Sequence, residues 1–154
     1  MKQGDTAPDF ALADDMGNTR TLSEYLTSGP VVLFFYPIAA SAGCTVEACH
    51  FRDLASEFAA VGAQRLGISP DSVTKQRQFS TTNSFDYPLL ADEGGLVAAQ
   101  FGVKRGKLLG KLTPVKRATF VIGTDRTVLA AFSSETNMKS HADRALEALK
   151  AKAA

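Results

Sequence analysis

The sequence has little of several features that would direct a functional assignment. Its 154 residues include two cysteines and two histidines, and the formal net charge is only +1. A charge this close to zero gives no general reason to expect a nucleic acid or a membrane surface as a partner. The longest apolar stretch, around Phe34, falls far short of a membrane span, and the N-terminus MKQGDTAPDF lacks the apolar segment of a signal peptide. We therefore expect a cytoplasmic protein.

The composition is typical of a globular protein, with 45% hydrophobic and 21% charged residues. The length suits one domain with a substantial core. Since no repeat, low-complexity segment or linker divides the chain, residues 1–154 are predicted to form a single domain. Two cysteines close together in a chain expected to stay in the cytoplasm indicate redox or catalytic use before a structural disulfide.

The most informative stretch is VVLFFYPIAASAGCTVEACHFRDL, residues 31–54. Residues 31–36 form a short apolar run typical of a buried strand. Pro37 ends this strand, and a turn of small residues follows at 39–43. A helix is predicted from Cys44 to about Val61, where Gly62 ends it. Its apolar residues at three-and-four spacing are Phe51, Leu54, Ala55 and Phe58.

This arrangement puts Cys44 in the first turn of a helix, directly after a strand. Unpaired backbone N–H groups and the positive end of the helix dipole favour a thiolate at such a position. Cys49, the other cysteine, follows five residues later. A plainer interpretation is that both are small buried hydrophobic residues. It suits Cys49 better than Cys44, which the glycine-bearing turn exposes.

Zinc binding is a further alternative, with His50 and His141 completing a ligand set. The spacing between Cys44 and Cys49 lies at the edge of the usual range, and the histidines do not repeat it. His50 fits an ordinary helix-surface residue, and His141 opens a helix far away in the sequence. We therefore predict no metal site.

Elsewhere, hydrophobic periodicity and turn residues predict alternating strands and helices. The expected segments are two short strands flanking a turn at 14–18, a short helix from Thr21 or Ser23 to Leu26, a strand at 64–69, a helix at 72–82, a strand at 85–90, a short helix at 95–101, two strands at 117–122 and 127–132 joined as a hairpin, and a helix at 139–152 that buries Ala145, Leu146 and Leu149. A helix separates the strands at 31–36 and 64–69, so these two should be parallel. The pattern predicts an α/β fold with a central mixed sheet flanked by helices.

The residues around Cys44 resemble the active-site motif of the peroxiredoxins. The matching segment is Tyr36-Pro37-x-x-x-Ser41-x-x-Cys44-Thr45-x-Glu47-Ala48-Cys49, followed by Phe51-Arg52-Asp53. It is most similar to the bacterioferritin-comigratory (Q-type) branch, where a resolving cysteine lies five residues after the peroxidatic one. Further similar segments are Gly4-Asp5-x-Ala7-Pro8-Asp9-Phe10, Gly67-Ile68-Ser69-x-Asp71-Ser72, Tyr87-Pro88-Leu89-Leu90-Ala91-Asp92 and Arg117-x-Thr119-Phe120-Val121-Ile122. The resemblance implies a thioredoxin-like fold.

The resemblance also implies a reaction. The Cys44 thiolate attacks hydrogen peroxide or an organic hydroperoxide and becomes a sulfenic acid, which condenses with Cys49 to a disulfide. A thioredoxin or a glutaredoxin-like protein then reduces that disulfide, and no metal, flavin or haem takes part. The expected assembly is a monomer or a weak homodimer.

Four further residues receive roles through the resemblance. The Arg117 guanidinium, the Ser41 hydroxyl and the Cys44 backbone N–H would stabilise charge on the peroxide oxygens. Arg117 begins an apolar strand, so it should be partly buried and needs a partner. Pro37 would shield the site from water. Glu47 would hold the guanidinium, or it is simply an acidic residue in the first turn of a helix.

The sequence departs from the family pattern at the turn before Cys44. Ser41 stands where the family usually has threonine, and Ala42 where it has proline, which loosens the turn. Ile38 and Ala39 replace a polar pair and make the mouth of the site more apolar. We expect these changes to alter rate and substrate preference, not the class of reaction.

Two rival classes of function remain, together with one unassigned segment. A thioredoxin-like disulfide reductase would normally carry C-x-x-C, and the longer spacing argues against it. A redox-inert binding or scaffold domain would keep the fold without turnover, and its only support is Ser41 and the missing proline. The segment 104–117 has several basic residues and no acidic one, namely Lys104, Arg105, Lys107, Lys111, Lys116 and Arg117. No aromatic residues interleave with them, so we predict a solvated loop and not a nucleic-acid site.

Overall fold

Strand β3 (Val31–Phe35) lies at the centre of the fold, and all five of its residues are buried. In this computed structural model, which describes residues 1–105 and 115–153, β3 pairs in parallel with β4 (Gln64–Ser69) and antiparallel with β6 (Ala118–Ile122). The predicted parallel pair is therefore confirmed. A strand buried on both faces reads as a continuous apolar run, which is why this run was visible in the sequence.

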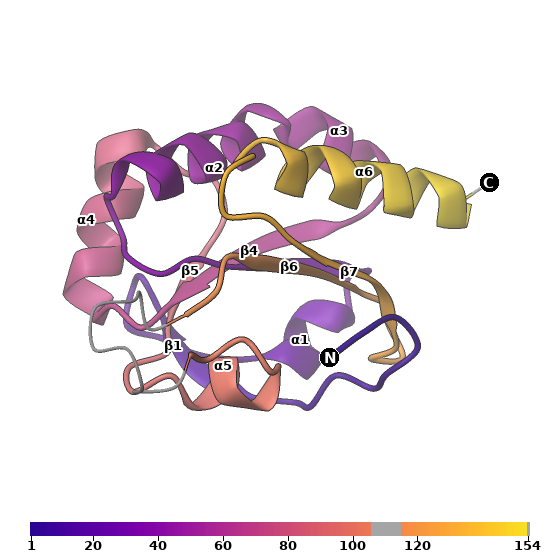
Figure 1. The fold of residues 1–154 in the computed structure, drawn as a ribbon, viewed down its shortest axis with the longest axis horizontal. Helices are drawn as coiled ribbons and strands as arrows, with labels where there is room; N and C mark the ends of the chain where they lie inside the picture. The colour runs from indigo at the N-terminus through magenta and orange to yellow at the C-terminus, as the bar shows by residue number, and fades with distance from the viewer. Residues whose placement is uncertain (106–114, 154) are drawn as a thin grey trace.

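The described residues form a mixed sheet of seven strands in the order β2-β1-β5-β4-β3-β6-β7 (Figure 1). The other strands are β1 (Ala11–Asp14), β2 (Thr19–Thr21), β5 (Leu89–Ala91) and β7 (Val128–Ser133). Hairpins join β1 to β2 and β6 to β7, both antiparallel, and the second of them was predicted from its turn residues.

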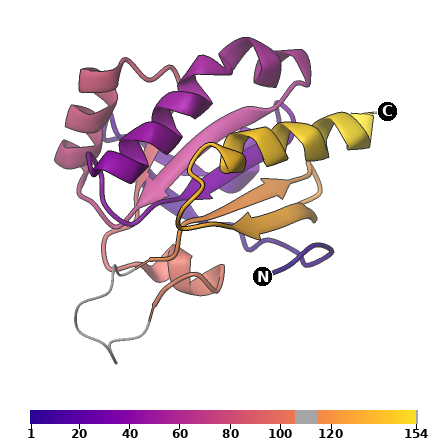
Figure 2. The same ribbon diagram turned by 45° about the horizontal axis from the view of Figure 1, so that its top comes forward.

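Helices cover both faces of the sheet (Figures 1 and 2). One face carries α2 (Ala42–Asp53), α3 (Ala55–Ala60), α4 (Val73–Asn83) and α6 (Ser140–Ala153), and the other carries α1 (Leu22–Leu26) and α5 (Leu96–Gln100). Side chains alternate along β3: Val31, Leu33 and Phe35 enter the core beneath α1 and α5, whereas Val32, Phe34 and Tyr36 enter the core beneath the other helices. The predicted α/β fold with a mixed sheet flanked by helices is confirmed.

Several predicted boundaries are wrong. The helix expected from Cys44 to about Val61 begins at Ala42 and is interrupted at Leu54, where α3 takes over. At this break the guanidinium of Arg65 donates a hydrogen bond of 2.8 Å to the Phe51 carbonyl. In an unbroken helix that carbonyl would accept from the residue four positions later. A side chain from β4 therefore takes part in ending α2, which helix periodicity does not reveal.

Two strands are shorter than predicted. The central strand ends at Phe35, one residue before the expected Tyr36. The strand expected at 85–90 is reduced to Leu89–Ala91, because the preceding residues turn so that Phe85 and Tyr87 stack with ring centroids 5.3 Å apart. The aromatic run that resembles a strand in the sequence is thus a packed turn.

The remaining predicted elements are present. Thr21 caps α1 by accepting a hydrogen bond from Glu24, and the closing helix α6 buries Ala145, Leu146 and Leu149 as expected. None of the described helices is long and apolar enough to cross a membrane. In the basic segment 104–117, the predicted loop residues Lys107 and Lys111 lie outside the described residues.

Candidate active site

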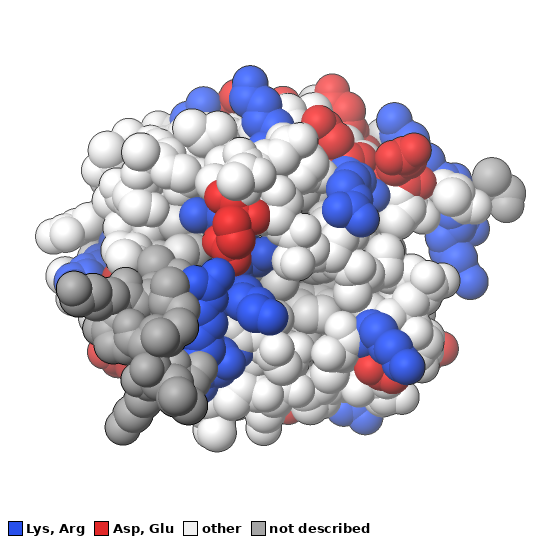
Figure 3. Space-filling model, viewed as in Figure 1, with Lys and Arg blue, Asp and Glu red and all other residues white. Residues whose placement is uncertain are grey.

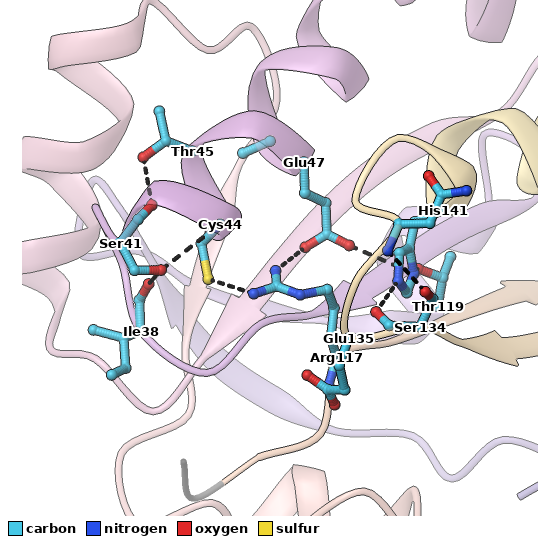
Figure 4. Close-up of polar contacts among 12 residues, drawn as sticks. Ile38, Ser41, Cys44, Thr45, Glu47, Arg117, Thr119, Ser134, Glu135 and His141 are labelled. Atoms are coloured by element: carbon cyan, nitrogen blue, oxygen red, sulfur yellow. Dashed lines mark hydrogen bonds and ion pairs between the residues drawn. The ribbon is translucent and has the colours of Figure 1, made fainter. Parts of the chain in front are cut away.

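Cys44 lies in the first turn of α2, and a loop of residues 36–41 connects strand β3 to this helix. Ser41 caps this helix: its hydroxyl accepts a hydrogen bond of 3.4 Å from the Cys44 backbone N–H and donates one of 3.1 Å to the Ile38 carbonyl (Figure 4). The Cys44 side chain is buried, so the expectation that the turn exposes it is wrong. Its thiol is free and faces the guanidinium of Arg117.

Arg117 directly precedes β6, whose first residue Ala118 pairs with Phe35. Because of this register, Arg117 lies at the edge of the sheet where β3 ends and the chain continues toward α2. The guanidinium donates one hydrogen bond of 3.3 Å from Nη2 to Cys44 Sγ and one of 2.7 Å from Nη1 to Glu47 Oε1. The prediction that Arg117 is buried and has a partner is confirmed, because it is only 5% exposed and has two.

Glu47 is fully buried beneath Arg117, one turn after Cys44. The alternative of an acidic residue in the first turn of the helix is wrong, because α2 begins at Ala42 and its first turn contains no acidic residue. Burial raises the pKa of Glu47 to about 8, and the nearby Arg117 charge only partly offsets this effect. This carboxyl therefore holds its proton more tightly than an exposed glutamate does, although it accepts a hydrogen bond from a guanidinium.

His141 and Thr119, which received no role in this site from the sequence, complete the buried cluster. His141, in the first turn of α6, is fully buried with Nδ1 2.7 Å from Thr119 Oγ1 and 3.4 Å from Glu47 Oε2. Its Nε2 lies 2.9 Å from the Ser134 carbonyl oxygen. Burial lowers the pKa of His141. One sequence signal was present: His141 lies four residues before Ala145, on the apolar stripe of α6.

Pro37 is buried in the loop between β3 and α2. The same loop exposes Ile38 and borders a cavity of about 370 Å³ against α4, where Ala39 and Phe79 also line the wall. The cavity has a polar side formed by Asp71 and Lys75. The expected apolar character of this loop is therefore present, on the side that faces α4.

Cys49 lies within the continuous helix α2, and its free thiol points to a different neighbour from that of Cys44. It donates to Asn83 Oδ1 at 3.7 Å, and Arg52 of the same helix donates to the Asn83 carbonyl at 2.7 Å. Five helical residues separate two Cα atoms by about 8–9 Å, beyond the roughly 7 Å that a disulfide tolerates. The two thiols therefore cannot bond while α2 keeps this form.

Both histidines have partners other than a metal ion. His50 pairs with Asp143 at 2.8 Å, and His141 belongs to the cluster around Glu47. Within residues 1–105 and 115–153 no group of three or more His, Cys, Asp or Glu side chains is arranged to hold a metal ion.

The basic segment has an acidic neighbour in the fold. Arg105 pairs with Glu135 at 2.9 Å, and on the face drawn in Figure 3 basic atoms left of the centre lie beside acidic ones. The absence of acidic residues from this segment of the sequence is therefore partly offset in three dimensions.

Comparison with known proteins agrees with this geometry. Residues 3–131 match the model of the AhpC/TSA family. The crystal structure of peroxidoxin BcpB from Mycobacterium tuberculosis is 64% identical in sequence, with a TM-score of 0.93, 98% of this chain and 97% of that one being covered. Peroxiredoxin Bcp of Bacillus subtilis is 37% identical over 149 residues, which cover 96% of this chain and 94% of the relative.

A third similar protein is the bacterioferritin comigratory protein of Xanthomonas campestris, whose structure was studied for its alkyl peroxide reduction activity. It is 32% identical with a TM-score of 0.84, and 94% of this chain and 92% of that one are covered.

The fold and the buried cysteine–arginine pair at a helix N-terminus define a thiol enzyme on a thioredoxin-like scaffold. The chain belongs to the AhpC/TSA family and is a peroxiredoxin, a thiol-dependent peroxidase. Its relatives include proteins named Bcp, as the motif around Cys44 predicted.

Proposed function

We propose that this protein reduces peroxides at Cys44 and passes the oxidation to Cys49 for recycling by an external dithiol. The observation that carries the proposal is the hydrogen bond from Arg117 Nη2 to Cys44 Sγ, with Glu47 holding the other arm of the guanidinium. An ordinary cysteine is only a few per cent ionised near neutral pH. The Arg117 guanidinium and the N-terminal end of α2 both direct positive charge at the Cys44 sulfur.

In the first step the Cys44 thiolate attacks one peroxide oxygen and the O–O bond breaks. Cysteine is oxidised to sulfenic acid, and the leaving oxygen takes up a proton to depart as water or an alcohol. Negative charge develops on that oxygen, and we assign the Arg117 guanidinium and the Ser41 hydroxyl as its donors. The hydroxyl must then turn away from the Ile38 carbonyl, to which it donates at 3.1 Å in the resting site. The buried Pro37 limits access of water.

In the second step the Cys49 thiol attacks the sulfenic acid sulfur, which releases water and forms a disulfide. A dithiol protein, thioredoxin or a glutaredoxin-like protein, then reduces the disulfide by thiol exchange. We infer that this happens in the cytoplasm, where reduced dithiols are plentiful, and that the enzyme works as a monomer or a weak homodimer.

Both hydrogen peroxide and organic hydroperoxides are proposed as substrates. The apolar wall that Ile38, Ala39 and Phe79 give to this cavity favours an alkyl chain, and the Xanthomonas relative is described as reducing alkyl peroxides. An apolar substituent gains free energy in proportion to the area that it buries.

Three variants test the proposal through peroxide consumption with a thiol regenerant. Cys44→Ser should abolish turnover. Cys49→Ser should still form a sulfenic acid that dimedone traps, but should lose turnover driven by a dithiol protein. Wild-type activity in Cys44→Ser would contradict the assignment, and dimedone-negative Cys49→Ser protein would contradict the order of the two steps.

Arg117→Ala tests the activating group. We expect the rate of peroxide attack to fall about 100-fold, the scale of losing one donor to a developing oxyanion. Arg117→Lys should recover only part of the loss, because a point charge cannot bond Cys44 and Glu47 as a planar fork does. An unchanged rate in Arg117→Ala would show that another group activates Cys44.

A further inference from the structure

The hydrogen bonds of His141 fix its tautomer. Nε2 lies 2.9 Å from the Ser134 carbonyl oxygen, which can only accept a hydrogen bond, so Nε2 carries a hydrogen. A neutral His141 therefore has its lone pair on Nδ1. This lone pair points into the cluster that holds Glu47 and Thr119 (Figure 4).

Glu47 Oε2 has an unfavourable environment unless a proton lies beside it. Among the described residues it has no hydrogen-bond partner, although it is fully buried. Its nearest histidine atom is Nδ1 of His141, at 3.4 Å. A bare carboxylate oxygen facing a lone pair is repelled, and a buried acceptor without a donor is costly. One proton between the two atoms removes both penalties.

Thr119 does not remove the need for this proton. Its hydroxyl lies 2.7 Å from His141 Nδ1 and can donate to the lone pair, but then Glu47 Oε2 still has no partner. The other oxygen of Glu47 already accepts from Arg117.

We propose that His141 is a positioning residue for the peroxidase reaction. It shares one proton with Glu47, so that the positive charge of Arg117 remains available to Cys44. With this proton present, Glu47 and His141 together are neutral, and the guanidinium balances the thiolate. Without it, the Glu47 carboxylate competes with the thiolate and with the developing charge on the peroxide. The inference rests on the proposed roles of Cys44 and Arg117.

The surrounding charges indicate where the proton resides. Arg117 and Arg144, the latter with its guanidinium carbon 4.4 Å from the Phe132 ring centroid, both disfavour an imidazolium at His141. Glu135 acts in the opposite direction and also accepts from the Arg117 backbone N–H. Burial favours the neutral forms of both Glu47 and His141. The proton therefore belongs mainly to Glu47 Oε2.

Two more titratable groups face the cluster. Cys44 lies on the opposite side of the guanidinium from Glu47, so its ionisation draws Arg117 toward the sulfur. The Tyr87 phenol donates to the Ala48 carbonyl, and burial keeps its pKa well above the ordinary value, so it stays neutral through the working range.

The kinetic test is the pH profile of peroxide attack, measured as a second-order rate constant. In the wild type the rate should fall on the alkaline side as Glu47 loses its proton, near pH 8. In His141→Gln an amide N–H can donate to the Glu47 carboxylate, so the alkaline fall should begin at least about one pH unit lower. At pH 7.5 we expect a several-fold loss of rate.

The control is His50→Gln, which changes a histidine on the outer side of α2 that pairs with Asp143. It should leave the alkaline fall unchanged. A purely structural role for His141 would lower thermal stability without moving this part of the profile. An alkaline fall at the same pH in His141→Gln and wild type would therefore overturn the proposal.

Infrared difference spectroscopy between pH 7 and 9.5 gives a readout that does not depend on turnover. In a Cys44→Ser background, a protonated carboxyl band should disappear on raising the pH. It should be absent from Glu47→Gln and already absent at pH 7 from His141→Gln. If the band is missing from the parent protein, the shared proton is contradicted even if the enzyme reduces peroxides. If the band is present but the wild-type protein has no peroxidase activity, only the proposed function is contradicted.

Discussion

At the scale of single residues, one guanidinium connects the two acidic groups of the site. Arg117 bonds Cys44 through Nη2 and Glu47 through Nη1, and the whole cluster is shielded from water. A lysine could not make both bonds in these directions. Burying a carboxyl behind this arginine has a cost in stability, and the cost depends on pH.

Glu47→Gln should therefore stabilise the protein increasingly as the pH rises, because the neutral amide carries no ionisation penalty. Below about pH 4.5 the Glu47 carboxyl is protonated in both the folded and the unfolded chain, so burial adds no ionisation penalty. Between 4.5 and about 8 the unfolded chain releases the proton and the folded chain retains it, so the free energy of unfolding falls as the pH rises. Glutamine removes this loss.

The measurement is urea unfolding of Cys44→Ser protein with and without Glu47→Gln, from pH 4.5 to 8.5. The two should be similar at the acidic end, and the glutamine variant should be more stable by on the order of 1–4 kcal/mol at the alkaline end. A difference that does not vary with pH would show that Glu47 titrates normally in the folded protein.

At the scale of elements, the proposed mechanism gives helix α2 two incompatible tasks. Its intact first turns bring Cys44 to Arg117, yet the same intact helix keeps Cys44 and Cys49 too far apart to bond. Under the proposed mechanism, the reduced protein therefore has to unwind part of α2 before Cys44 and Cys49 can bond. Contacts from Cys49 and Arg52 to Asn83 hold α2 against α4 and oppose this unwinding.

We predict that oxidation to the disulfide speeds amide hydrogen exchange across residues 41–52 and leaves β3 protected.

Asn83→Ala should also accelerate disulfide formation by about 2- to 10-fold, the effect of losing one neutral hydrogen bond in the starting state. Acid quenching, thiol alkylation and mass spectrometry follow this step.

The matched control for Asn83→Ala is Thr81→Ala, an exposed position on the same helix. It should leave the rate of disulfide formation unchanged.

For the amide-exchange prediction, equal exchange in the reduced and oxidised protein would mean that the disulfide forms without unwinding of α2.

The sequence predicted most elements of this architecture, because strands and helices follow from local periodicity. Cys44 at a helix start could be inferred from the strand, turn and helix around it. Its partner Arg117 required the resemblance to a family, since 73 residues separate the two. Residue interactions across the fold explain the failures: Arg65 takes part in ending α2, and stacking of Phe85 on Tyr87 shortens β5.

His141 and Asn83 were missed for the same reason. Each belongs to a helix whose sequence shows only that it is amphipathic or polar, and each reaches the site through packing against α2. A polar residue on an apolar stripe, such as His141 on α6, was the one available indication.

At the scale of the whole molecule, the sheet separates two cores with different relations to catalysis. One contains Phe35, Phe101 and Phe120, beneath α1 and α5. The other contains Phe34 and Phe51, whose rings stack 4.1 Å apart beneath α2. Both cores stabilise the fold, but only the second contacts the helix that must unwind.

Phe51→Leu and Phe101→Leu separate these contributions. Both phenylalanines are fully buried, so each substitution should lower the free energy of unfolding by on the order of 1–1.5 kcal/mol, measured in urea. Phe51 lies on α2 and packs against Phe34 and Phe58, so its loss should also favour local opening of this helix. Disulfide formation after peroxide attack should then be several-fold faster in Phe51→Leu and unchanged in Phe101→Leu. If both variants accelerate this step equally, the disulfide forms through global unfolding, and α2 does not open as a separate unit.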